Sequence, residues 1–231
     1  MKKIFLGPPG SGKGTAASRV APIKNIPHIS TGELFRQNIK QGTEIGLKAK
    51  QYMETGNLVP DEVVIGMLKN RIEQDDCKNG FILDGFPRTL PQAEMLKQII
   101  GADIAINLDV SDEIVIKRLN SRKSCSQCGE IYNTRTMPTK QEGICDKCQG
   151  EVITRPDDEP ETIKKRLETY KEQTFPLIKF YEDLGILKNV TCTNIDQTAE
   201  ETLNDVLNAI EEFTKDIKDT VSETFGSPNK E

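Results

Sequence analysis

A glycine-rich segment near the N-terminus, Gly7-Pro8-Pro9-Gly10-Ser11-Gly12-Lys13-Gly14-Thr15, constrains the fold more than any other part of the sequence. It follows a short apolar run at 3–6 and precedes a segment with helical apolar spacing. Glycines let backbone N–H groups wrap round a phosphate, the helix N-terminus adds partial positive charge, and Lys13 can reach the outer phosphate oxygens. The sequence therefore predicts a phosphate-binding loop. The alternative is a glycine-rich turn with a solvated lysine.

Short apolar runs bounded by Gly or Asp recur at 80–83 and 104–108. Each is followed by a segment whose apolar residues have helical spacing. This alternation, together with the loop, predicts an α/β fold of the P-loop NTPase type, with a parallel β-sheet and helices on both faces. Active sites of such sheets lie at the carboxyl ends of the strands.

The strand–helix alternation breaks in two segments. Residues 30–59 have helical patterns without an intervening strand, and residues 122–158 are rich in Cys, Gly, Pro and Thr. We expect both to be insertions into one core domain. Two long helical patterns follow at 161–184 and 198–213, and residues 222–231 form a polar end that we expect to fray.

The composition argues against a polyanionic partner and against a membrane span. Charged residues make up 29% of the 231 residues and the net charge is -5, so we expect no nucleic-acid binding. No stretch approaches the roughly 18 uninterrupted apolar residues that a span requires, and the N-terminal run has no signal-peptide core. We therefore expect no membrane association and a cytoplasmic location.

Four of the six cysteines form two Cys-x-x-Cys pairs. The pairs are Cys125 with Cys128 and Cys145 with Cys148, and sixteen residues separate them. This spacing is typical of a four-cysteine zinc site, in which the thiolates fill the tetrahedral shell and leave no position for water. We therefore expect a structural Zn²⁺. Disulfides, or an iron centre of the same geometry, are the alternatives.

Several motifs resemble those of the adenylate kinase family. The general loop pattern has Ser or Thr directly after the lysine, but here Gly14 takes that place and the hydroxyl follows at Thr15, an ending found in that family. Ser-Thr-Gly-Glu-Leu-Phe-Arg at 30–36 resembles the start of its AMP-binding lobe, and Asp-Gly-Phe-Pro-Arg-Thr at 84–89 its most characteristic hexapeptide. The cysteines resemble the family's long form with a zinc lid. The resemblance covers residues 3 to about 195.

The resemblance implies a reversible, Mg²⁺-dependent transfer of the terminal phosphoryl group of ATP to AMP, which gives two ADP and maintains adenine nucleotide balance. It implies a monomer with a core of residues 1–29, 60–121 and 159–217, an AMP-binding lobe of 30–59, a zinc-binding lid of 122–158 and a polar tail of 218–231. Such a transfer demands no general base, because an AMP phosphate with a second pKa of about 6 is already largely anionic at neutral pH.

The resemblance also assigns site residues. Arginine suits these sites because its planar fork makes bidentate, permanently charged contacts to phosphate. The implied ATP-binding residues are Gly10, Ser11, Gly12, Lys13, Gly14, Thr15, Arg118 and Arg122. The implied AMP-binding residues are Thr31, Arg36, Val59, Gly85, Arg88, Gln92, Arg155 and Arg166. The implied catalytic residues are Lys13, Arg88, Arg122, Arg155 and Arg166, with Asp84 holding Mg²⁺ through water and with Asp157 and Asp158 orienting arginines or the waters of the metal.

Several of these residues have ordinary structural alternatives. Thr31 alone fits a helix N-cap, and Arg118 and Arg122 are four apart on a predicted helix, as many solvent-facing pairs are. We expect a structural role for the single histidine, His28. Glu33 departs from the family pattern, in which aspartate is commoner at this place.

Three rival functions remain open at this stage. A thymidine-kinase-type enzyme also combines a phosphate loop with a four-cysteine zinc module, but it gives no reason for the motif at 84–89 or for the helical segment 30–59. A zinc module that binds nucleic acid needs a basic face with aromatic residues, whereas 124–160 is mixed in charge and has only Tyr132. The nearest rival is an enzyme of the same architecture that uses GTP as the donor, or UMP or CMP as the acceptor. The long lid argues against the pyrimidine enzymes, which have short lids.

Overall fold

The computed structural model describes residues 1–225, and the side chains of residues 1–220. Its strands are β1 (Lys2–Leu6), β2 (His28–Ser30), β3 (Phe81–Asp84), β4 (Ile104–Val110), β5 (Arg122–Cys125), β6 (Ile131–Asn133), β7 (Val152–Ile153) and β8 (Leu187–Cys192). Its α-helices are α1 (Lys13–Lys24), α2 (Thr31–Gln41), α3 (Glu44–Glu54), α4 (Asp61–Ile72), α5 (Leu90–Ile99), α6 (Asp112–Asn120), α7 (Pro160–Thr169), α8 (Pro176–Asp183) and α9 (Ala199–Phe225). Short helical turns occupy Asp75–Cys77 and Pro156–Asp158, and a π-helical turn, Tyr170–Thr174, joins α7 to α8.

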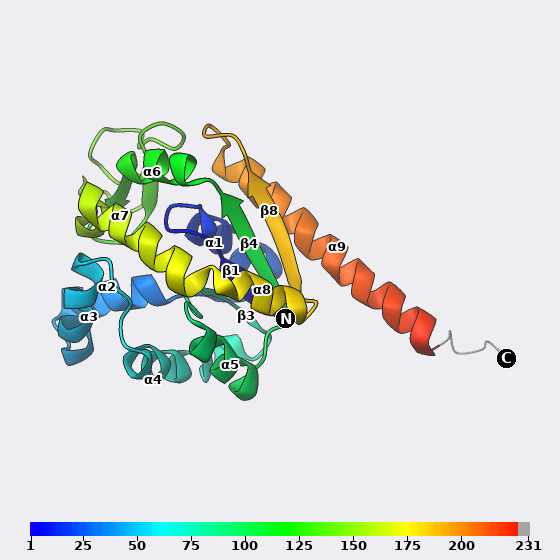
Figure 1. Ribbon diagram of the computed structural model, residues 1–231. Helices are drawn as coiled ribbons and strands as arrows, with labels where there is room; N and C mark the ends of the chain where they lie inside the picture. The colour runs from blue at the N-terminus through cyan, green and yellow to red at the C-terminus, as the bar shows by residue number, and fades with distance from the viewer. Residues whose placement is uncertain (226–231) are drawn as a thin grey trace.

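The central sheet of the described chain has the order β2-β3-β1-β4-β8, and all of its neighbouring strands are parallel. The predicted α/β fold with a parallel sheet is confirmed (Figure 1). The sequence did not indicate the two edge strands. Strand β2 has only three residues, and in β8 only Val190 and Cys192 are buried, so neither contains the continuous apolar run that marks a strand buried on both faces.

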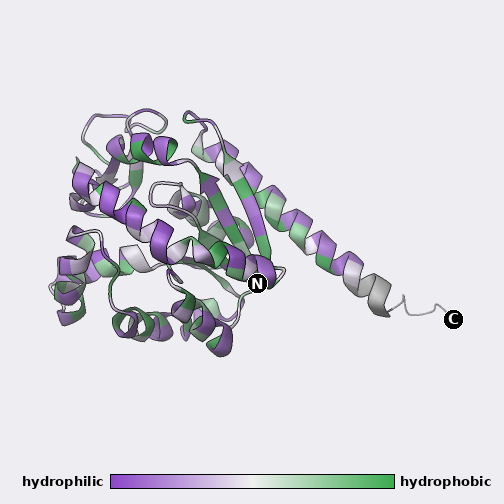
Figure 2. Ribbon diagram, in the orientation of Figure 1, coloured by the Kyte–Doolittle hydropathy of each residue, from purple (hydrophilic) through white to green (hydrophobic). Residues whose placement is uncertain are grey.

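Hydrophobic side chains pack against both faces of the sheet. Successive residues of β1 alternate between the faces: Phe5 packs with α1, α6 and α9, whereas Ile4 and Leu6 pack with α4, α5 and α8. Figure 2 shows hydrophobic and hydrophilic residues mixed along the helices, as expected for helices with one face on the sheet and the other in solvent. The sheet is therefore a rigid frame whose carboxyl edge stays open for polar loops.

Both predicted insertions lie at this carboxyl edge (Figure 1). The helical insertion (residues 30–59) consists of α2 and α3, and its entry is fixed by Ser30, whose hydroxyl accepts the N–H of Glu33. Thr31 is thus the first helical residue, and Ser30 is the N-cap. The cysteine insertion (residues 122–158) is built on an antiparallel sheet with the order β6-β5-β7.

The helical pattern at 161–184 corresponds to the continuous run of α7, the π-helical turn and α8. The helix expected at 198–213 is longer in the structure. Helix α9 extends to Phe225 and includes residues 218–225 of the expected tail. Gly226 and Pro228 are the first strong helix-stop residues after Phe213. Residues 226–231 lie outside the described part of the chain. Within residues 1–225, no helix combines the length and hydropathy needed to cross a membrane.

Candidate active site

The predicted phosphate loop joins β1 to α1 at the carboxyl edge of the sheet. Gly12 caps α1 with a φ of +97°, in the left-handed region that glycine adopts without strain. The N–H of Ser11 and the Nζ of Lys13 both donate to the carbonyl oxygen of Pro8 at 3.1 Å. The loop and the first turn of α1 line a cleft, so the N-terminus of α1 offers its partial positive charge to an anion there.

The structure gives a reason for the glycine that follows Lys13. A Cβ atom added at Gly14 would lie 3.1 Å from Oδ2 of Asp84, which is tighter than most Cβ contacts. A side chain at this position would therefore crowd Asp84, which β3 brings close to the first turn of α1. The departure from the general loop pattern accommodates an acidic side chain beside the loop.

The charges of Asp84 and Lys13 are coupled. Burial raises the pKa of Asp84, but a hydrogen bond from His28, whose Nε2 lies 3.4 Å from Oδ2, and the charge of Lys13 together lower this pKa to about 2. Burial lowers the pKa of Lys13 to about 8, against the opposing effect of Asp84. Asp84 is thus an ionised carboxylate at neutral pH. His28, for which we expected a structural role, contacts this site carboxylate.

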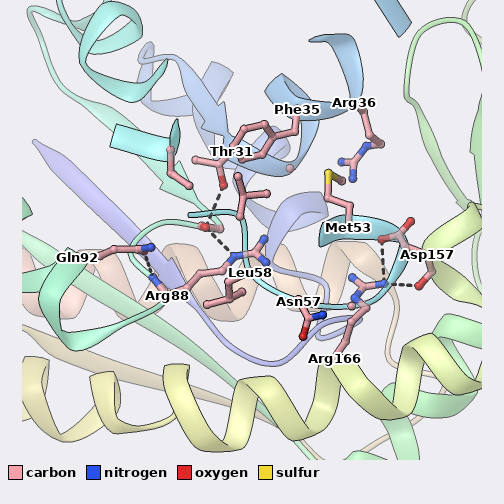
Figure 3. A pocket seen from close by; sticks show the side chains of 15 residues that line it. Thr31, Phe35, Arg36, Met53, Asn57, Leu58, Arg88, Gln92, Asp157 and Arg166 are labelled. Atoms are coloured by element: carbon pink, nitrogen blue, oxygen red, sulfur yellow. Dashed lines mark hydrogen bonds and ion pairs between the residues drawn. The ribbon is translucent and has the colours of Figure 1, made fainter. Parts of the chain in front are cut away.

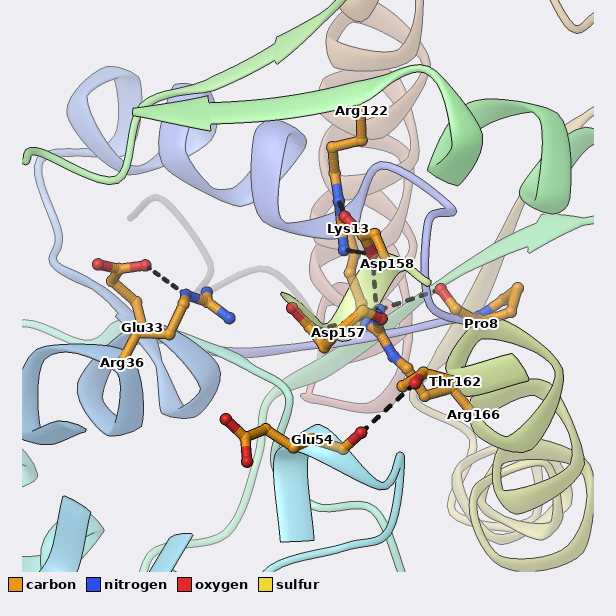
Figure 4. A network of polar contacts seen from close by, with 10 residues as sticks. All are labelled: Pro8, Lys13, Glu33, Arg36, Glu54, Arg122, Asp157, Asp158, Thr162 and Arg166. Atoms are coloured by element: carbon orange, nitrogen blue, oxygen red, sulfur yellow. Dashed lines mark hydrogen bonds and ion pairs between the residues drawn. The ribbon is translucent and has the colours of Figure 1, made fainter. Parts of the chain in front are cut away.

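Two aspartates position two of the predicted arginines (Figure 4). Asp158, whose side chain is fully buried, accepts hydrogen bonds from Nε and Nη2 of Arg122 at 2.7 and 2.5 Å, and from Nη1 of Arg166 at 3.1 Å. Asp157 pairs with the same Nη1 at 3.0 Å. Arg122 is the first residue of β5 and does not belong to the helix on which we expected it, because α6 ends at Asn120.

Arg155 differs from its neighbours because it is buried without a matching acceptor. It is 6% exposed, and within the described side chains its Nε has no hydrogen-bond partner. Burial, followed by the charges of Arg36 and Arg122, lowers its pKa to about 9. Burial also lowers the pKa of Arg88 and of Arg166. Buried cations are costly unless an anion compensates them, so this cluster suits a multiply charged anionic ligand.

A pocket between the helical insertion and the core, here called the acceptor pocket, collects most residues predicted to bind AMP (Figure 3). Its predicted lining residues are Thr31, Arg36, Val59, Gly85, Arg88, Gln92 and Arg166. Arg155 lines the adjoining cleft instead. The sequence did not indicate the apolar walls, because apolar residues at such spacing are typical of a core. These walls are Phe35, Met53, Leu58 and Val64.

The larger cleft, here called the donor cleft, lies between the phosphate loop and the cysteine insertion. Of the residues predicted to bind ATP, those that line it are Gly10, Gly12, Lys13, Gly14, Thr15, Arg118 and Arg122. Ser11 belongs to the loop but does not line the cleft, because Ser11 is only 1% exposed. Nη1 of Arg118 donates to the carbonyl of Ser11 at 3.2 Å, which ties α6 to the loop. No sequence motif indicated the contact between two residues that line this cleft, from Nη2 of Arg19 to Sδ of Met137 at 3.3 Å.

The acceptor pocket and the donor cleft share lining residues. Arg36, Arg88 and Arg166 line both the acceptor pocket and the donor cleft. A ligand in each hollow would therefore present its charged end to the same arginines.

The four predicted cysteines converge in the cysteine insertion. Their sulfur atoms all lie within 4.8 Å of one another, with Cys125 and Cys148 at 3.4 Å and Cys128 and Cys145 at 3.6 Å. All four are free thiols, and a tetrahedral zinc site with Zn–S bonds of about 2.3 Å needs sulfur separations of about 3.8 Å. Burial raises the pKa of Cys145, but a hydrogen bond with Tyr132 contributes to lowering it to about 6. The donor set and its spacing fit a closed four-thiolate site.

Comparison with known proteins agrees with this geometry. Residues 5–186 match the family model described as adenylate kinase. The chain belongs to the adenylate kinase family. It is 51% identical over 212 residues to an adenylate kinase of Lachnoclostridium phytofermentans, covering 90% of this chain and 96% of the relative. It is 53% identical over 198 residues to one of Agathobacter rectalis, covering 84% and 92%, and 52% identical over 203 residues to one of Thermodesulfovibrio yellowstonii, covering 85% and 94%.

Membership of the adenylate kinase family makes the protein a phosphotransferase of the nucleoside monophosphate kinase class. The matched region runs from β1 to the segment before β8, so it includes both insertions and every predicted site residue.

Proposed function

We propose that this enzyme transfers the terminal phosphoryl group of ATP to AMP, giving two ADP, and that Mg²⁺ accompanies the ATP. The observation that carries the proposal is the meeting of the acceptor pocket and the donor cleft at Arg88 and Arg166. Two hollows that share buried cations suit two nucleotides whose phosphates approach end to end.

In the proposed reaction, an oxygen of the AMP phosphate attacks the terminal phosphorus of ATP. The bond from that phosphorus to the bridging oxygen breaks, and ADP leaves with the bridging oxygen and its electron pair. Lys13 and the N-terminus of α1 hold the donor phosphates, while Arg88, Arg155 and Arg166 neutralise charge on the transferring group and the acceptor. The attacking oxygen is already largely deprotonated at neutral pH, so no side chain is needed to take its proton.

Asp84 has the properties of a residue that holds Mg²⁺ through water. It is a carboxylate at the end of β3, 7% exposed, with a pKa of about 2 and a position beside the phosphate loop. Carboxylate and water oxygens suit this hard cation. When bound, Mg²⁺ neutralises charge on the donor phosphates.

The proposal is tested by measuring phosphoryl transfer with ATP and GTP as donors, each against AMP, UMP, CMP and dTMP as acceptors. A clear preference for ATP with AMP is the expected result. Preference for another pair would retain the chemistry and reject the nucleotide assignment. Absence of transfer with every pair, by folded and metal-replete protein, would reject the function.

We propose that the helical insertion binds AMP and that the cysteine insertion is a lid over the core. We also propose that the enzyme is a monomer in the cytoplasm. Nζ of Lys40 in α2 donates to the carbonyl oxygens of Ser126 and Gln127 at 3.3 Å, so the two insertions touch over the site. Closure of this kind excludes water, the competing acceptor of the phosphoryl group.

We also propose that the four cysteines hold a structural Zn²⁺. Removing the metal with a thiol-competent chelator should unfold the cysteine insertion at a lower temperature than the core, because its small sheet and few buried apolar residues give little stability without the metal. Limited proteolysis during heating, with cleavage sites mapped to 122–158, measures this order. Unchanged unfolding after verified metal loss would contradict it.

Nucleotide binding should take up a proton at Lys13 in alkaline solution. Its pKa of about 8 in the protein alone should rise beside a polyphosphate, so at about pH 9 the binding of a non-hydrolysable ATP analogue should take up close to one proton. Affinity should therefore fall as the pH rises above about 8. Titration calorimetry in buffers of different ionisation enthalpy measures the uptake, and Lys13→Met should abolish it. Affinity that is constant from pH 7 to 9 would be the contrary result.

A further inference from the structure

Two groups of the protein hold the side-chain amide of Gln92 in one orientation. Gln92 lies in the first turn of α5, lines the acceptor pocket and is only 2% exposed. Its Oε1 accepts the backbone N–H of Arg88 at 2.7 Å, a contact drawn in Figure 3. Its Nε2 donates to Oδ1 of Asp61 at 2.5 Å.

Only one orientation of the amide satisfies both contacts. A backbone N–H can only donate and a carboxylate oxygen accepts, so a flipped amide would set donor against donor at Arg88 and acceptor against acceptor at Asp61. An amide has two N–H groups and an oxygen with two lone pairs. The two contacts therefore leave one N–H of Nε2 and one lone pair of Oε1 for a ligand.

The order of this remaining donor and acceptor distinguishes purines. Adenine donates from its 6-amino group and accepts at N1, whereas guanine and hypoxanthine accept at O6 and donate from N1. A glutamine amide can pair with two adjacent positions of a base edge, and it does so only when its own donor and acceptor are in the matching order. The fixed amide of Gln92 therefore matches adenine, and turning it over would favour a 6-oxopurine in the same position.

We propose that Asp61 is a positioning residue that makes the acceptor site select adenine over 6-oxopurines, by fixing the amide of Gln92. The inference rests on the proposed function, in which Gln92 faces the acceptor base. Asp61 is the first residue of α4 and is not among the residues that line the acceptor pocket, so it acts through Gln92. Its contact spans 31 positions of the chain and joins the start of α4 to the start of α5.

The test is the steady-state kinetics of Asp61→Asn with ATP as donor and with AMP or IMP as acceptor. An asparagine can donate as well as accept, so it tolerates either orientation of the neighbouring amide. The ratio of kcat/KM for AMP to that for IMP should fall by about 10- to 100-fold, the range for a hydrogen bond to a charged group. The KM for AMP should rise, whereas kcat with saturating AMP should stay within about 3-fold, because the phosphate-binding arginines are untouched.

Glu62→Gln is the matched control. Glu62 is the next residue in the first turn of α4 and is exposed, so its substitution removes the same charge from the same helix end. It should leave the ratio for AMP and IMP unchanged. Asp61→Glu, which retains a carboxylate, should retain most of the preference for AMP.

A double-variant cycle separates action through Gln92 from a general structural effect. In a Gln92→Ala background, Asp61→Asn should have no further effect on the AMP to IMP ratio, because the amide that it orients is gone. An unchanged ratio in Asp61→Asn, or effects of the two substitutions that simply multiply, would overturn the proposal. A wild-type enzyme that prefers an acceptor other than AMP would instead reject the proposed function.

Discussion

Replacing Arg88 with alanine should lower kcat/KM for phosphoryl transfer from ATP to AMP by about 10³-fold or more, the scale on which single arginines stabilise such transition states. Arg88 lies where the acceptor pocket and the donor cleft meet, so in the proposed reaction its charge acts on both phosphates at the point of transfer. Aspartates hold Arg122 and Arg166, whereas the Arg88 side chain, within the described part of the chain, donates only to the carbonyl of Gly85, at 2.8 Å. Its guanidinium therefore keeps most of its donors for phosphate oxygens.

The fold should survive this substitution. The carbonyl of Gly85 still accepts the hydroxyl of Thr31 at 2.9 Å, and the backbone groups of Arg88 keep their bonds to Gln92 and Thr174. The thermal midpoint should therefore stay close to that of the wild type. Arg88→Lys, which keeps the charge and loses the planar fork, should recover only part of the activity. An Arg88→Ala enzyme with near-normal kcat/KM would show that the transfer takes place elsewhere.

The parts of the fold and site that the sequence predicts are those encoded by residues close together in the chain. The phosphate loop directly follows buried β1, and the hexapeptide at 84–89 begins at the last residue of buried β3, so the strands fix where Lys13 and Asp84 lie. The convergence of the four cysteines was equally predictable, because two Cys-x-x-Cys pairs at this spacing are typical of a metal site.

The parts that could not be predicted depend on contacts between distant residues of common type. Asp61 and Lys40 look like ordinary charges on amphipathic helices, and only the packing of α4 and α2 brings them to Gln92 and to the cysteine insertion. Pairing with β4 stabilises β8, which has little apolar patterning of its own. Local pattern cannot reveal such elements, because their stability comes from tertiary contacts.

Asp158→Asn should lower the free energy of unfolding by about 3–5 kcal/mol, the cost of removing one partner of a buried ion pair. Asp158 is the carboxylate that binds both Arg122 and Arg166, and its side chain is fully buried between them. Within the described side chains, the cluster of Arg122, Arg155 and Arg166 would then keep only Asp157 as a close counter-charge. For a chain of this size, the thermal midpoint should fall by about 10 °C, which differential scanning calorimetry measures.

The same variant can show whether lost charge or lost packing causes the destabilisation. Inorganic tripolyphosphate, a multiply charged anion, should raise the thermal midpoint of Asp158→Asn more than that of the wild type, because the variant has more unbalanced positive charge at the site. Glu113→Gln breaks the ion pair on α6 between Lys117 and Glu113, which is 76% exposed. This substitution should change the midpoint by no more than about 1 °C. Equal stabilisation of variant and wild type by tripolyphosphate would assign the loss to packing. Because the aspartate holds arginines that face the transferring phosphate in the proposed reaction, the charge explanation also requires that kcat falls together with stability.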